Sequence, residues 1–114
     1  MVSTLADLQR WGRALAKGTL LSKRLQRTRL RFRAIATLSG PPVGYGLGIF
    51  RIGDWIGHNG AIFGFNAITM YEPRTGAQIA VVANKSSSSS NEATAAFLPI
   101  AAAIVPGSVD PVAP

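Results

Sequence analysis

The sequence feature that most restricts the fold is a pair of β-branched segments separated by a turn. Residues 67–72 and 77–83 are rich in Ile, Val and Thr, and residues 73–76 place a proline and a glycine between them. Turn geometry favours both of these residues, so the two segments are predicted to pair as an antiparallel hairpin. The chain is therefore expected to contain an antiparallel sheet.

Two more strands are predicted upstream of this hairpin. Residues 45–52 and 55–61 combine aromatic and β-branched residues with glycines, and the Gly-Asp pair at 53–54 offers a turn between them. The glycine and prolines of residues 39–42 interrupt the preceding pattern and mark a boundary between a helical and a sheet region. Residues 43–84 are accordingly expected to form three or four antiparallel strands.

Residues 1–38 are predicted to be helical. Thr4 caps a first helix, Asp7 lies where its carboxylate reaches back to the cap amide, and Gly18 ends the helix. Its apolar residues recur at helical spacing, so the helix is amphipathic. A second, strongly basic helix is expected at 20–32.

The end of the sequence combines a helix with low-complexity segments. Five serines at 86–90 form a connector, Asn91 is the expected cap of a helix over 91–105, and Pro99 implies a kink in it. Residues 107–114 are Pro-rich and are expected to form a disordered tail. Helices and strands together predict an α+β fold, an antiparallel sheet with packed helices.

Positive charge is concentrated in one segment. The net charge is +7, and nine of the twelve basic residues lie between Arg10 and Arg33. One interpretation is a small basic module that binds nucleic acid or an anionic surface, because clustered Lys and Arg release counterions from phosphates. The other is a solvated helical face. Leucines alternate with these basic residues and no aromatic stacking platform accompanies them, so no nucleic acid partner is expected.

Rare and absent residue types limit the chemistry. The chain has no cysteine and one histidine, which excludes a thiolate nucleophile and a Cys-based metal site, and no metal or other cofactor is expected. No run of about 18 apolar residues is present to span a membrane. The N-terminus lacks the pattern of a signal peptide, and the localisation stays open.

The single histidine, His58, lies among small residues in a predicted strand. A lone histidine near a strand end is more often a structural polar group than a catalyst. Gly57 and Gly60 flank it, however, and leave room for another backbone to approach, as a ligand that pairs with the strand would require. They also weaken the strand, so an ordinary structural strand gains nothing from them. This spacing makes His58 a candidate functional residue.

A series of short motifs runs through the chain in a recognisable order. The motifs are Val2-Ser3-Thr4, Ala6-Asp7-Leu8 with Trp11, Tyr45-Gly46-Leu47-Gly48, Gly57-His58-Asn59-Gly60, Gly64-Phe65, Glu72-Pro73, Val81-Val82-Ala83-Asn84-Lys85 and an Ala-rich helix. In this order the sequence resembles the C-terminal third of class C β-lactamase-like serine hydrolases, which include D-alanyl-D-alanine carboxypeptidases, penicillin-binding proteins and esterases. The resemblance covers residues 1–106 and implies a partial β-lactamase/transpeptidase-like fold.

The resemblance also implies roles for four residues. His58-Asn59-Gly60 matches the family's third active-site motif, a Lys-Thr-Gly or His-x-Gly strand that lines one side of the site. His58 is then the catalytic residue, which polarises or hydrogen-bonds the substrate. Asn59, Gly60 and Ala61 bind substrate, with the Ala61 amide as one of two oxyanion-hole donors. Histidine in place of lysine favours a D-amino-acid peptidase or an esterase over hydrolysis of a β-lactam.

Two motifs of that family are missing from the sequence. No serine is followed three residues later by lysine, and no tyrosine is followed two residues later by asparagine. In the family, Ser-x-x-Lys supplies the nucleophile with its activating amine, and Tyr-x-Asn assists proton transfer. The chain is therefore interpreted as the C-terminal part of a serine hydrolase, inactive alone, whose partner is a missing N-terminal portion. Related enzymes act in the periplasm, at the cell envelope or after secretion.

Overall fold

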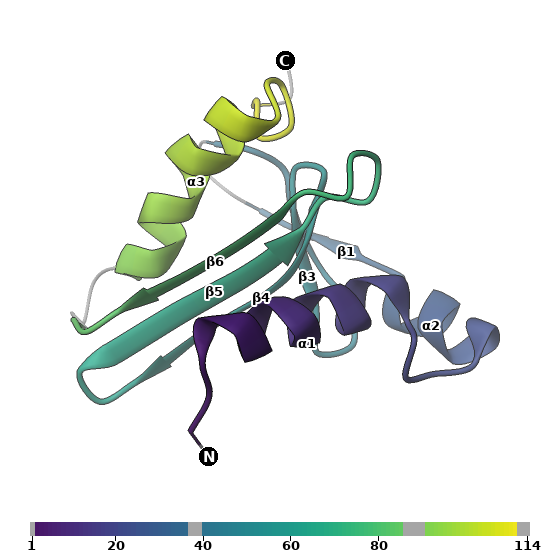
Figure 1. Cartoon of the computed structure of the whole chain (residues 1–114). Coiled ribbons are helices and arrows are strands. Elements are labelled where there is room, and N and C mark those ends of the chain that lie inside the picture. Colours follow the sequence, from purple (N-terminus) through teal and green to yellow (C-terminus); the bar gives the residue numbers. More distant parts are fainter. Residues whose placement is uncertain (1, 37–39, 86–90, 112–114) are drawn as a thin grey trace.

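A computed structural model describes residues 2–36, 40–85 and 91–111 of the chain (Figure 1). The elements are α1 Leu5–Lys17, α2 Lys23–Arg29, β1 Arg33–Ile35, β2 Val43–Tyr45, β3 Phe50–Ile52, β4 Trp55–Ile62, β5 Phe65–Tyr71, β6 Gln78–Ala83 and α3 Glu92–Ile104. The strands of the described residues form one six-stranded antiparallel sheet in sequential order, β1 to β6. The predicted α+β class is confirmed, with more strands than the three or four expected.

The additional strands come from two segments that the sequence patterns described differently. The strand expected at 45–52 is two strands, β2 and β3, because the chain reverses between them and Gly46 N–H donates to the Ile49 carbonyl oxygen over 2.8 Å. Gly48 takes a φ of +64° in this turn, a conformation that glycine adopts without strain. β1 lies inside the region predicted to be helical, residues 1–38, where pairing with β2 satisfies its backbone.

Capping side chains fix the helix ends. In α1, Thr4 and Asp7 form the predicted capping box, and Gly18 closes the helix in the left-handed conformation with a φ of +71°. The second helix is shorter than the expected 20–32, because Ser22 caps it and it ends at Arg29. None of the helices among the described residues is long and apolar enough to cross a membrane.

The main core lies between the sheet and α3. Asn91 caps α3 as predicted, and the helix continues through Pro99. Trp55 and Phe97 are fully buried and meet edge to face, with ring centroids 5.5 Å apart. The other buried members of this core are Phe50, Ile52, Ile68, Met70, Ile79, Ala93, Ala101, Val105 and Val109. The serine connector predicted at 86–90 lies outside the described residues.

Helix α1 covers the opposite face of the sheet (Figure 1). Successive residues of β5 point to opposite faces, so Ile68 joins the α3 core while Thr69 meets α1. The Thr69 hydroxyl donates to the Leu8 carbonyl oxygen over 3.0 Å, and a Cβ added at Gly12 would lie 2.3 Å from the Thr69 hydroxyl oxygen. Helix and strand thus approach closely because position 12 has no side chain.

The expected disordered tail at 107–114 is wrong for its first residues. Ser108 is 2% exposed, its hydroxyl accepts a hydrogen bond from Trp55 Nε1 over 2.8 Å, and its carbonyl oxygen accepts one from the Asp54 amide. Val109 is also buried. Composition predicted disorder, but the buried indole N–H needs an acceptor, and Ser108 supplies it. Residues 112–114 lie outside the described part of the chain.

The turn between β5 and β6 is organised by a buried carboxylate. Glu72 is 1% exposed and accepts hydrogen bonds from the Arg74 amide over 2.9 Å, the Thr75 amide over 2.7 Å and the Thr75 hydroxyl over 2.5 Å. Burial alone raises the pKa of Glu72. The three hydrogen bonds outweigh that effect, together with the nearby Arg74 charge, so the pKa lies below its ordinary value.

Candidate functional site

All four predicted site residues, His58 to Ala61, lie on β4, and the β4–β5 turn fixes the direction of their backbone groups. Ile62 and Phe65 pair across a two-residue turn, so they exchange backbone hydrogen bonds. Along an antiparallel pair of strands, hydrogen-bonded residue pairs alternate with pairs that are not hydrogen-bonded. Counting back from Ile62, the backbones of Gly60 and His58 therefore also form hydrogen bonds with β5. The N–H and C=O groups of Asn59 and Ala61 therefore point to the other edge of β4.

That other edge is open beside the motif. Strand β3 pairs with β4 only over residues 55–57, whereas β5 pairs with it as far as Ile62. Across the described ranges, no backbone carbonyl accepts a hydrogen bond from Asn59 or Ala61. We call residues 58–62 of β4 the open edge. An extended ligand can add to such an edge by main-chain hydrogen bonds.

The two glycines around His58 differ in their surroundings. A Cβ at Gly57 would lie 1.9 Å from the Thr69 carbonyl oxygen and 2.8 Å from the Met70 sulfur, so this glycine permits close packing with β5. A Cβ at Gly60 would meet nothing within 4 Å. At Gly57 the backbone that approaches closely, as predicted, is that of the neighbouring strand β5. At Gly60 no protein atom occupies the corresponding space.

The His58 imidazole is held by polar and aromatic contacts. The Tyr45 hydroxyl lies 2.8 Å from Nε2, and Nδ1 contacts the carbonyl oxygen of Asn59. The ring also meets Phe50 at an angle of 60°, with centroids 5.2 Å apart. His58 is partly buried, so its imidazole is ordered at the open edge while part of it stays accessible.

A cavity lies between α1 and the strands that carry the motif. Its volume is about 210 Å³. Leu8, Trp11 and Leu15 form its α1 side, and the opposite side is lined by His58, Asn59, Gly60, Ala67, Ile68 and Thr69. Trp11 is 52% exposed, so the cavity is not closed off from solvent. A small apolar group fits beside His58 in this space.

The Asn59 side chain is engaged within the protein. Its side-chain amide donates to the Thr94 hydroxyl over 3.1 Å, which ties β4 to the first turn of α3. Successive residues face opposite sides of the strand, so this side chain projects from the face opposite His58. The Asn59 N–H, rather than its side chain, is the group that this residue directs to the open edge, because the Asn59 carbonyl oxygen contacts His58 Nδ1.

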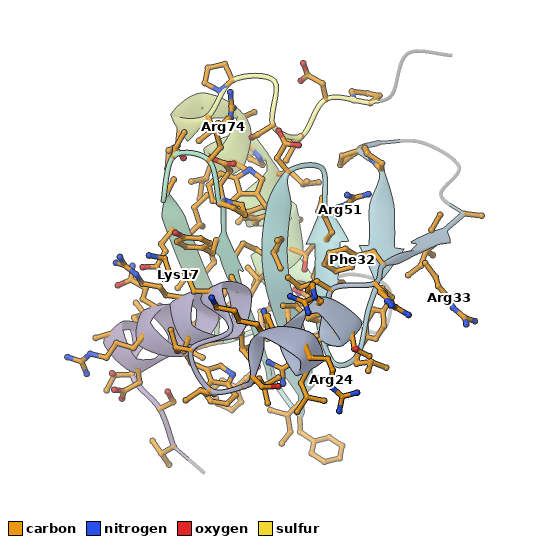
Figure 2. All side chains as sticks on the ribbon, turned by 90° about the vertical axis from the view of Figure 1, so that its right-hand side faces the viewer. Lys17, Arg24, Phe32, Arg33, Arg51 and Arg74 are labelled. Carbon is orange, nitrogen blue, oxygen red and sulfur yellow. The ribbon has the colours of Figure 1, made fainter. Side chains whose placement is uncertain are left out.

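Most of the basic side chains between Arg10 and Arg33 are exposed. Figure 2 shows Arg24 on α2 and Arg33 on β1 directed outward, in agreement with their exposure. The Arg51 guanidinium lies over the Phe32 ring, 5.4 Å from its centroid. In α1, Arg10 pairs with Asp7 over 3.2 Å, and both side chains are exposed. These positions agree with a solvated face.

Comparison with known families decides the affiliation of this fold. A family model described as Beta-lactamase matches residues 1–103. The chain belongs to the beta-lactamase family. Its matched region includes the open edge, the cavity helix α1 and most of α3. Among curated proteins, none matches the chain.

Sequence reasoning did not identify several residues that shape the site of this beta-lactamase family member. Tyr45 and Phe50 contact the imidazole, and Thr94 binds the Asn59 amide. Tyr45 belongs to the motif Tyr45-Gly46-Leu47-Gly48, but nothing in that motif indicates a contact with a strand two positions away in the sheet. The reversal between β2 and β3, which brings Tyr45 to His58, was itself not predicted.

Proposed function

We propose that this chain supplies one side of the active site of a class C-type serine hydrolase, with His58 as its catalytic side chain. The Ser-x-x-Lys and Tyr-x-Asn motifs come from an N-terminal portion that this sequence does not contain. Gly60 keeps the strand thin, and the Ala61 amide is one donor of the oxyanion hole. Alone, the chain is inactive, because acyl transfer requires a positioned nucleophile and its base.

The observation that carries this proposal is the open edge. The Ala61 N–H points away from β5 on the stretch of β4 that β3 does not cover, and Gly60 faces empty space within 4 Å of its Cβ position. An oxyanion donor needs this arrangement, a fixed backbone N–H directed at a place where a reacting carbonyl can lie. Membership of the beta-lactamase family supports the same reaction class.

The proposed substrates are D-amino-acid peptides and esters rather than β-lactams. Both present an extended acyl group that can pair with a strand edge. An imidazole can both accept and donate hydrogen bonds through its two nitrogens, whereas a lysine ammonium only donates them. Substrate discrimination is thereby assigned to His58.

Reconstitution tests the proposal. The chain is joined in frame to a family N-terminal portion that carries Ser-x-x-Lys and Tyr-x-Asn, and hydrolysis of an activated ester, a D-alanyl-D-alanine peptide and a chromogenic β-lactam is followed. The joined protein is expected to hydrolyse the ester or the peptide, and the isolated chain none of the three. His58→Ala should lower kcat/KM by about a hundredfold, the usual scale of a proton-transfer group.

Two further variants separate catalysis from folding. Gly60→Ala is expected to lower kcat/KM without lowering the unfolding midpoint, because the added methyl meets no protein atom within 4 Å but projects into the cavity on the face of β4 that carries His58. Arg74→Ala, in the exposed turn between β5 and β6, is the matched control and should leave the rate unchanged. Full activity with alanine at position 58 would contradict the assignment of the motif.

A further inference from the structure

Tyr45 lies outside the His58-Asn59-Gly60 motif but reaches its imidazole. It belongs to β2, and the whole of β3 separates that strand from β4 in the sheet. Its hydroxyl lies 2.8 Å from His58 Nε2, and the two rings meet at 82° with centroids 5.7 Å apart. Phe50, the strand partner of Tyr45, contacts the same imidazole. The ring of His58 is therefore held from the β2–β3 hairpin.

The two polar contacts of the imidazole determine its tautomer. A backbone carbonyl oxygen only accepts hydrogen bonds, so the contact of Nδ1 with the Asn59 oxygen places the proton on Nδ1. A neutral imidazole carries one proton, which leaves Nε2 with a lone pair. Nε2 then accepts the hydrogen bond from the Tyr45 hydroxyl. Unconstrained histidine favours the other tautomer in water, so both contacts together select the less common form.

We propose that Tyr45 is a positioning residue that fixes His58 as the Nδ1–H tautomer and makes Nε2 the proton-accepting nitrogen of the open edge. The inference deepens the proposed function and rests on it for the catalytic use of Nε2. The tautomer itself follows from the contacts of this chain alone. A proton taken up at Nε2 leaves Nδ1–H on the Asn59 carbonyl, so the imidazolium keeps its orientation.

The test uses the single histidine of the chain, which gives one set of imidazole signals in ¹⁵N-labelled protein. Long-range ¹H–¹⁵N correlation spectra are recorded at about pH 9, where an ordinary imidazole is neutral. The wild type is expected to show a protonated Nδ1 and an unprotonated Nε2. Tyr45→Phe, which keeps the ring and removes the hydroxyl, should shift the Nε2 resonance toward the Nε2–H form.

Tyr71→Phe is the matched control, because it removes the hydroxyl of the other tyrosine and should leave the imidazole spectrum unchanged. An Nε2–H wild type would overturn the inference without any variant. An Nδ1–H wild type that Tyr45→Phe leaves unchanged would also overturn it, because the Asn59 carbonyl alone would then set the tautomer. The expected spectra with a catalytically inert reconstituted protein would support the positioning by Tyr45 and reject the proposed function.

Discussion

Gly12→Ala tests how closely α1 packs on the face of the sheet that carries the cavity. A Cβ at this buried position would lie 2.3 Å from the Thr69 hydroxyl oxygen and 3.3 Å from Thr69 Cβ and Cγ2. Rotation of the Thr69 side chain can move the oxygen away, but it would break the hydrogen bond to the Leu8 carbonyl oxygen. The substitution therefore forces either a shift of α1 or the loss of that bond.

The expected magnitude is a difference between two effects. Alanine in a helix interior is more stable than glycine by about 1 kcal/mol. Overpacking of a well-packed contact costs about 1–3 kcal/mol. Gly12→Ala should therefore lower the free energy of unfolding by roughly 1 kcal/mol. In a Thr69→Ala background the obstructing oxygen and methyl are absent, so the same substitution should raise it by about 0.5–1 kcal/mol.

Urea denaturation of the wild type, the two single variants and the double variant measures the change in the free energy of unfolding that Gly12→Ala causes in each background. At a slope of about 2 kcal/mol/M, a change of 1 kcal/mol moves the midpoint by roughly 0.5 M. The difference between the two effects is a coupling energy of about 1.5–2 kcal/mol between positions 12 and 69, within the range found for residues in direct contact. Stabilisation by Gly12→Ala in the wild-type background would refute the close approach of α1 to β5.

Three further predictions concern stability and association. Ser108→Ala should lower the free energy of unfolding by about 1–3 kcal/mol in thermal or urea melts, because the buried Trp55 N–H loses its acceptor; an unchanged melt would indicate a loose tail. In the folded protein the pKa of Glu72 lies below its ordinary value of 4.5. The ionised carboxylate therefore adds to the free energy of unfolding above pH 4.5, and this contribution is lost as the pH falls through the folded pKa. Glu72→Gln should make the free energy of unfolding, measured in urea melts, depend less on pH in this acid range. Strand β6 ends the sheet of the described residues, so the wild type should form oligomers in size-exclusion runs, and Val82→Lys should reduce them; equal elution would reject edge pairing.

Local signals predicted the elements whose ends are set by neighbouring residues. The Thr4 and Asp7 capping box, the Gly18 end of α1 and the Asn91 cap of α3 each depend on contacts within a few residues, and all were predicted correctly. The β5–β6 hairpin was found for the same reason, because its turn lies between two β-branched segments. Helix ends and hairpin turns can be predicted from the sequence because the partners of each hydrogen bond are close in the sequence.

Residues that depend on distant partners were misread. Ser108 was assigned to a Pro-rich, disordered tail because its partner Trp55 lies 53 positions away. β1 was assigned to the helical region because its hydrogen bonds come from β2, across the segment 37–39 and the turn that follows. Local composition carries no information about such pairings, so it predicted the wrong state for both.

The sequence by itself determined the α+β class, the position of the His58 motif in a strand and the absence of Ser-x-x-Lys and Tyr-x-Asn from this chain. Only the tertiary structure decided which edge of β4 is open and which residues hold the imidazole. The direction of the Ala61 amide follows from the pairing register, and the Tyr45 contact follows from the folding of β2 and β3 onto β4. Both depend on strand pairing, and an antiparallel register is set jointly by the turn and by the faces that the paired strands bury, so the residues of one strand do not determine it.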